Sequence, residues 1–267
     1  MKKFSCLFIA VLAIFTSCSK DDLEATEPNA IDSNPNGTVL KKMTVNLNGG
    51  AEITTEEYFY NANKLAKITS SDDKNTVFTY TGNLITKKEF YSSGALNTTE
   101  IFEYNPSNQL VNFKRVNPSN KTVYRGVYVY NPDGTITATG YKGDLTDQKS
   151  QISNRKVFIE NAQISKIETY ETVNGTPTTE TTRYTFDSKS TPFINILGFD
   201  KLTYYDSVMS GNAHNIIGST STNSTNSKSD NEAFDYAYNK ANLPISSSEN
   251  NAIKTAGGSI IFQYFYE

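Results

Sequence analysis

The chain has 267 residues and a formal net charge of −3, with 25 Lys and Arg against 28 Asp and Glu. This balance offers no basic surface for nucleic acid and no cationic face for anionic lipid. The chain holds 17 Tyr and 15 Phe but no Trp. Together with frequent Ser, Thr and Asn, these residues favour strands and turns over helices. The composition predicts a secreted, antiparallel all-β protein.

Residues 1–17 have the pattern of a signal peptide. Lys2 and Lys3 precede an apolar run from Phe4 to Phe15 that is shorter than the roughly 20 residues needed to span a bilayer. The following "FTSC" resembles a lipoprotein box, which implies cleavage before Cys18 and acylation of that cysteine. The alternative is an ordinary signal peptide with an incidental cysteine. Since the other cysteine lies in the removed segment, the mature chain can form no internal disulfide.

The residues directly after the cysteine carry a second targeting pattern. Ser19, Lys20, Asp21 and Asp22 resemble the export signal of Bacteroidota surface lipoproteins, which implies an outer-membrane protein that faces the cell exterior. Without such a signal, a lipoprotein would be expected to face the periplasm. Residues 18–38 are rich in Pro, Asn and acidic residues, as in a flexible tether. Such a tether would reach roughly 25 Å from the membrane.

From about residue 39 onward, a short pattern repeats along the chain. Two aromatic residues two positions apart are followed by Asn or Asp, a turn, and then an aliphatic residue, as in "YVYNPDGTI" at residues 128–136. A spacing of two places both rings on one face of a strand. The first aromatic residues of the units are Tyr58, Phe78, Phe102, Tyr128, Phe158, Tyr184, Tyr236 and Phe262.

Each unit therefore reads as one β-hairpin, with Asn or Asp at the corner. Eight hairpins would supply up to about sixteen strands, and a sheet of that width normally curls or closes. We predict that residues 39–267 form a single all-β domain, an antiparallel meander of repeated hairpins that is strongly curved or barrel-like. The gap from Tyr184 to Tyr236 is twice that of its neighbours, so one unit is either degenerate or enlarged by an insertion.

Two segments depart from the repeat. Residues 205–233 form a polar insertion, and its low-complexity part "STSTNSTNSKSDN" predicts a mobile loop. Just before it, "STPFINILGFDKL" at residues 190–202 is apolar enough to form a short helix or a plug.

The phrase "YNPDGTI" at residues 130–136 resembles the YD repeat of Rhs-type proteins, with Asn for Asp and Ile for Leu. The lipid box, the export signal, the "YxYN" hairpins and the C-terminal "FQYFYE" together resemble Bacteroidota surface lipoproteins of unknown function. That resemblance implies a single porin-like β-meander domain, and it implies no activity.

The residue types that carry catalysis are scarce. His214 is the only histidine, the mature chain keeps only Cys18, and the carboxylate pairs Asp72–Asp73 and Glu56–Glu57 occupy ordinary solvated positions. We therefore expect no catalytic residue, metal or cofactor. The main hypothesis is a non-enzymatic surface module for binding or structure, whose partner is a glycan or a protein. The alternatives are an extracellular glycan-acting enzyme and a carrier of an apolar ligand within the curved sheet.

The aromatic rows are the candidate binding surface. Tyr rings can stack on a ligand, but they can equally cover one face of the sheet as its core. The candidate ligand-facing residues are Tyr60, Tyr80, Tyr104, Tyr130 and Tyr238.

Overall fold

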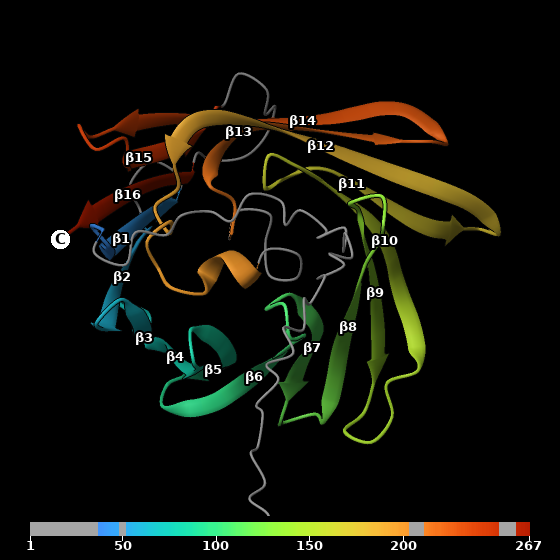
Figure 1. Ribbon diagram of the computed structural model, residues 1–267, viewed down its shortest axis with the longest axis horizontal. Helices are drawn as coiled ribbons and strands as arrows, with labels where there is room; N and C mark the ends of the chain where they lie inside the picture. Colours follow the sequence, from blue (N-terminus) through green and yellow to red (C-terminus); the bar gives the residue numbers. More distant parts are fainter. Residues whose placement is uncertain (1–36, 48–51, 203–210, 251–259) are drawn as a thin grey trace, which may run out of the picture.

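The computed structural model describes residues 37–47, 52–202, 211–250 and 260–267. Its strands form one closed antiparallel barrel, in which each strand pairs with its sequence neighbours and the last pairs with the first (Figure 1). The predicted all-β meander is confirmed, and it closes into a barrel of 16 strands. The strands are β1 (Leu40–Leu47), β2 (Glu52–Asn61), β3 (Lys64–Ser70), β4 (Lys74–Thr81), β5 (Leu84–Ser92), β6 (Ala95–Tyr104), β7 (Leu110–Asn117), β8 (Thr122–Tyr130), β9 (Ile136–Gly143), β10 (Ser150–Glu160), β11 (Gln163–Val173), β12 (Thr176–Ser190), β13 (His214–Asn223), β14 (Asn226–Tyr238), β15 (Pro244–Glu249) and β16 (Ile260–Tyr266).

The repeated phrase forms the corners between even-numbered and odd-numbered strands. In the β6–β7 corner, the Asn105 side chain accepts hydrogen bonds from the backbone N–H groups of Ser107 and Gln109, at 3.0 and 2.9 Å. In the β8–β9 corner, Gly134 has a φ of 77°, which a residue with a side chain rarely adopts. All these corners lie at one end of the barrel, which we call the corner end. The opposite end, where odd strands lead into even strands, is the loop end.

The wide gap in the repeat is an enlarged corner between β12 and β13. Tyr184 lies on β12 and Tyr236 on β14, so no hairpin is missing between them. The connection contains η1 (Phe199–Leu202), the one helical element among the residues that the structure describes. Residues 191–202, which we call the plug segment, lie in the middle of the ring of strands (Figure 1). The apolar stretch at residues 190–202, predicted to form a short helix or a plug, contains the short helix η1 and also lies inside the barrel.

The polar insertion is different from what the sequence indicated. Residues 214–223 and 226–238, which include most of the low-complexity stretch expected to be a mobile loop, form the hairpin β13–β14 of the barrel. The Ser and Thr residues of this hairpin continue the sheet, because β-branched Thr suits a strand and the ladder bonds are made by the backbone. Residues 203–210 lie outside the described residues.

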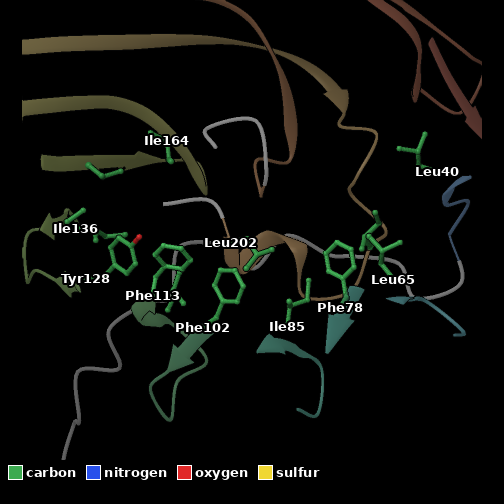
Figure 2. Close-up of a cluster of buried hydrophobic side chains, with 14 of the residues drawn as sticks. Leu40, Leu65, Phe78, Ile85, Phe102, Phe113, Tyr128, Ile136, Ile164 and Leu202 are labelled. Atoms are coloured by element: carbon green, nitrogen blue, oxygen red, sulfur yellow. The ribbon is translucent and has the colours of Figure 1, made fainter. Parts of the chain in front are cut away.

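The inner face of the barrel is apolar toward the corner end. Leu65, Ile85 and Phe113 are completely buried, and they belong to one cluster with Ile196 and Leu202 of the plug segment. Figure 2 shows side chains from β3, β4, β5, β6 and β7 directed toward Leu202. Burying side chains of this size contributes about 1.5–3 kcal/mol each. The plug segment therefore fills the apolar part of the lumen.

The outer face carries charged side chains around most of the barrel. Because neighbours along a strand alternate between faces, residues adjacent to the buried ones point outward. The paired outward positions include Lys87 and Glu89 on β5, which form an ion pair at 3.0 Å, and Lys166 and Glu168, which form one at 2.7 Å. The other outward charges are Lys42, Glu57, Lys67, Glu103, Lys114, Arg125, Lys156 and Arg183.

Candidate functional site

The candidate tyrosines Tyr60, Tyr80, Tyr104 and Tyr130 lie at the corner ends of β2, β4, β6 and β8 and pack against the core. Their hydroxyl groups bond the backbone at the start of the preceding strand. Tyr60 donates to the Leu40 carbonyl at 2.6 Å, Tyr104 to that of Ile85 at 2.7 Å, and Tyr130 to that of Leu110 at 3.1 Å. Tyr80 accepts from the Leu65 N–H at 3.1 Å and donates to the Leu197 carbonyl at 3.2 Å.

These hydrogen bonds lie just beyond the last backbone pairs between the two strands that they join. Pairing between β5 and β6 ends at Lys87 and Ile101 toward the corner end, so Ile85 has no partner residue on β6. The Tyr104 hydroxyl occupies the position of the missing ladder donor, since a buried carbonyl without a partner is costly. Pairing between β7 and β8 likewise ends at Asn112 and Val127, before Leu110. Each tyrosine therefore closes the gap between two diverging strands, and we call this contact a tyrosine latch.

One latch was missed by the sequence analysis. Tyr266 on β16 donates its hydroxyl to the Pro244 carbonyl at 2.7 Å. The repeat assigned the second aromatic position to Tyr264, which instead contacts the Ser247 hydroxyl at 2.8 Å in the core. The alternating aromatics of "FQYFYE" held the signal, because Tyr266 is also two residues from Tyr264.

Tyr238 has a different partner because the β12–β13 corner is enlarged. Its hydroxyl bonds the carboxylate of Asp187, which also accepts the backbone N–H groups of Lys189 and Asn215, at 2.9 and 3.1 Å. This network holds together the two ends of the connection that carries the plug segment. His214, which belongs to the polar insertion at residues 205–233, begins β13 and is half-buried, with Nδ1 3.0 Å from the Lys189 carbonyl.

Burial keeps the latch hydroxyls protonated. It raises the pKa of Tyr80 to about 12, although the bond from the Leu65 N–H opposes this shift. Burial also raises the pKa of Tyr60 and of Tyr104 above the ordinary value. These three hydroxyls therefore stay protonated to a higher pH than exposed tyrosines do. The latches give these tyrosines a structural task, and a ligand-facing role for them stays a prediction.

The lumen becomes charged beyond the apolar core. Glu100 on β6 is 1% exposed and lies between two cations on neighbouring strands. Its Oε1 accepts from the Arg115 guanidinium at 2.7 Å, and its Oε2 is 3.4 Å from Lys88 Nζ. Lys88 is itself buried, with its ammonium 5.6 Å from the centre of the Phe102 ring. This buried ion network marks the boundary between the apolar and the polar parts of the inner wall.

A small pocket adjoins this boundary on β8, β9 and β10. Tyr124, Tyr128, Ser153 and Arg155 contribute polar groups to its lining, and Gly126 and Gly140 form its base. Its volume of about 20 Å³ is enough for one or two water molecules. Sequence analysis did not identify these residues, because they belong to three strands whose register is not visible in the repeat. Gly126 and Gly140 within predicted strands were the available signal.

The carboxylate pairs of the sequence analysis are not brought together as acid and base. Asp72 lies in the exposed β3–β4 turn, where a 2.5 Å hydrogen bond from Lys74 lowers its pKa. Glu56 accepts the Tyr58 hydroxyl at 2.8 Å, whereas Glu57 pairs in register with Lys42 on the opposite face of the sheet. Among the described residues, no three His, Cys, Asp or Glu side chains are grouped so that they could hold a metal ion.

The targeting residues Cys18, Ser19, Lys20, Asp21 and Asp22 lie outside the described residues. In the part of the chain that the structure describes, no helix is long and apolar enough to cross a membrane.

Comparison with known proteins supports the fold. No protein-family model matches the sequence, and no curated protein matches it. The structure is similar to a porin-like protein from Bacteroides vulgatus, with a TM-score of 0.52 and 14% identity over 86% of this chain and 99% of that one. It is also similar to a porin-like protein from Bacteroides uniformis, with a TM-score of 0.51 and 12% identity over the same shares of the two chains. At these identities, the likeness establishes a shared barrel fold.

Proposed function

We propose that this protein is a non-enzymatic outer-membrane lipoprotein, anchored through Cys18, whose barrel stands in water at the cell surface and binds a partner there. Residues 1–17 are its signal peptide, and residues 18–38 are its tether. The porin-like neighbours from Bacteroides are consistent with an outer-membrane setting. The lipoprotein box and the acidic export signal supply the anchor and the outward orientation.

The polarity of the two barrel faces is the observation that carries this proposal. A barrel that crosses a membrane turns an apolar band about 25 Å tall toward the lipid. The outer face of this barrel instead holds lysines and arginines on adjacent strands, such as Lys114 on β7 and Arg125 on β8, which pair in register. Each Lys or Arg at the bilayer midplane costs about 2–4 kcal/mol. A ring of such residues favours water as the surroundings of the barrel.

The filled lumen of the barrel also favours a binding protein over an open channel. A barrel of this strand number leaves an aqueous lumen when nothing occupies it. The plug segment fills the apolar end, where Ile196 and Leu202 are 2% and 0% exposed. Because the chain itself covers these apolar side chains, we rank a carrier of an apolar ligand below a module that binds through its polar surfaces.

Removing the anchor tests the proposal. The chain from residue 19 onward is expressed behind a signal peptide that directs cleavage without acylation, and it is compared with the acylated protein. We expect the acylated form to sediment with membranes and the unacylated form to remain in the aqueous periplasmic fraction. An unacylated chain that stays in membranes after carbonate washing, and that conducts ions in planar bilayers, would show that the barrel itself spans the bilayer.

The orientation is tested separately on intact cells. We expect added protease to cleave the acylated protein, and replacement of Lys20, Asp21 and Asp22 by alanine to protect it without preventing acylation. Protection of the unmodified protein until the outer membrane is opened would place the barrel in the periplasm.

A further inference from the structure

The pocket on the inner wall at β8, β9 and β10, which we call the wall pocket, is the most distinctive polar site of the lumen. Its base is a row of small residues in register across three strands: Gly126 pairs with Gly140, and Gly140 pairs with Ser153. A β-bulge between Gln151 and Ser153 interrupts the β9–β10 register beside the pocket. Bulges redirect side chains and are frequent next to functional sites.

The two glycines make room for hydroxyl groups. A Cβ atom at Gly140 would lie 2.7 Å from the Tyr124 hydroxyl and 2.3 Å from the Ser153 hydroxyl. A Cβ atom at Gly126 would lie 2.9 Å from the Tyr128 hydroxyl. Three hydroxyl groups thus converge over a stretch of wall that has no side chains of its own.

Arg155 adds a positive charge to these three hydroxyls. It pairs in register with the buried Ala138, so its side chain is on the inner face, where it lines the pocket. Within the described part of the chain, its guanidinium forms no hydrogen bond or ion pair. Arg115 and Lys142 flank Tyr124 in register on β7 and β9, and no carboxylate lines the pocket. Tyr184 lies farther round the wall. Burial raises the pKa of its hydroxyl, the positive charge of Arg155 opposes this shift, and the carboxylates of Glu232 and Glu180 add to it.

We propose that the wall pocket binds the carboxylate group of a ligand that enters the lumen from the loop end. A guanidinium matches a planar carboxylate through two parallel N–H donors, and hydroxyl groups supply the remaining hydrogen bonds. The volume of about 20 Å³ is the space of one or two water molecules, which the two oxygen atoms of a carboxylate can occupy, whereas a tetrahedral sulfate or phosphate is larger. The body of the ligand lies in the lumen. This inference rests on the proposed function, since it requires a lumen open to water.

Galacturonate and galactose provide a matched pair of probes, because they differ at one carbon that is a carboxylate in one and a hydroxymethyl group in the other. Binding of each sugar, of acetate and of sulfate to the full mature protein in detergent is measured by isothermal titration calorimetry. We expect galacturonate and acetate to bind, galactose to bind at least tenfold more weakly than galacturonate, and sulfate to bind more weakly than acetate.

Variants locate the site. Arg155→Ala is expected to weaken galacturonate binding at least tenfold, and Arg155→Lys to weaken it less, since it keeps the charge but loses the paired donors. Arg183→Ala removes an equal charge from the outer face and is expected to change nothing. Gly140→Ala is expected to weaken binding, because its Cβ would displace the Tyr124 and Ser153 hydroxyl groups. Far-ultraviolet circular dichroism and thermal unfolding of Arg155→Ala establish that this variant is folded.

The proposal is overturned if galactose binds as tightly as galacturonate, if sulfate binds as tightly as acetate, or if folded Arg155→Ala binds as the unmodified protein does. Absence of carboxylate binding at tens of millimolar also overturns it. Because this assay is made in detergent, it is independent of the fractionation test. A failed titration with the expected fractionation rejects the wall pocket alone, whereas an unacylated barrel that remains in membranes rejects the proposed function.

Discussion

The two ends of the barrel lumen are built differently. At the corner end, Phe113 and Ile85 are completely buried and Leu202 of the plug segment packs between the strands. Toward the loop end, the same inner face carries Glu100, Arg115 and Arg155, and Arg155 is exposed. One face of one sheet thus changes from core to polar surface along its strands. The corner end supplies the apolar core, and the polar part of the wall holds the buried ion network and the wall pocket.

The largest expected effect is at the corner end. Replacing Phe113 by alanine removes a fully buried ring and leaves a cavity beside Phe102, whose ring centre is 5.4 Å away. We expect the free energy of unfolding to fall by about 4 kcal/mol, as for other buried aromatic side chains. Urea denaturation followed by circular dichroism measures the change.

The matched control is Val129→Ala, on the outer face of β8, where the side chain is 54% exposed. We expect it to change the free energy of unfolding by less than about 0.5 kcal/mol. A Phe113→Ala variant that loses no more than Val129→Ala would mean that the corner end is not the stabilising core.

The second prediction concerns the boundary between the two ends. Glu100→Gln removes the negative charge that lies between Lys88 and Arg115, and so takes away a carboxylate that is 3.4 Å from the buried Lys88 ammonium. We expect a loss of about 3 kcal/mol in the free energy of unfolding, because breaking a buried ion pair exposes the full cost of the remaining charge. Urea denaturation at neutral pH measures it.

Glu103→Gln, on the outer face of the same strand, is the control. Glu103 accepts a hydrogen bond from Asn112 at 2.8 Å at an exposed position, so we expect less than about 0.5 kcal/mol. The double variant Lys88→Met with Glu100→Met removes both buried charges, and we expect it to be more stable than Glu100→Gln. The reverse order would show that the network is needed for more than charge compensation.

Alkaline pH tests the buried tyrosines, the latch residue Tyr80 and the core residue Tyr264 among them. Burial raises the pKa of Tyr80 and of Tyr264 to about 12, whereas tyrosines of the unfolded chain titrate near 10. Above pH 10 the unfolded state therefore loses protons that the folded state keeps. The stabilisation is complete below pH 10 and is lost as the pH rises toward 12. Urea midpoints at intervals from pH 8 to pH 12 measure this loss. Midpoints that stay constant over this range would contradict burial of the tyrosines.

The repeat made most of this fold predictable from sequence. Aromatic pairs at a spacing of two, followed by Asn and a turn, fixed the face and the corner of each hairpin, and these features depend on neighbouring residues alone. The hairpin β13–β14 was misjudged because Ser and Thr are common in both loops and strands, and pairing with β12 and β15 decides between them. Composition could not reveal that pairing.

The candidate site was harder to predict for a related reason. The tyrosine latches join strands that diverge, and divergence is a property of barrel geometry that no single hairpin contains. Arg155 reaches the wall pocket because β8, β9 and β10 have a particular register. The repeat therefore identified the aromatic residues, but it could not identify their hydrogen-bond partners, because these lie on other strands.

The smallest expected loss of stability comes from removing the hydroxyl of one latch tyrosine, and it is compared with removing an exposed hydroxyl. Tyr130→Phe keeps the ring in the core but leaves the Leu110 carbonyl without the hydroxyl donor that lies 3.1 Å away. We expect the free energy of unfolding to fall by about 1 kcal/mol, the usual net contribution of such a bond. Tyr170→Phe also removes one hydroxyl, which donates to Glu168 at an exposed position, and we expect almost no change.

Urea denaturation of both variants and of the double variant Tyr104→Phe with Tyr130→Phe completes the test. Each latch closes its own pair of strands, β5 with β6 and β7 with β8, so the two losses should add to about 2 kcal/mol. Equal stability of Tyr130→Phe and Tyr170→Phe would remove the structural task of the latches. It would favour the ligand-facing role that the sequence suggested for the same tyrosines.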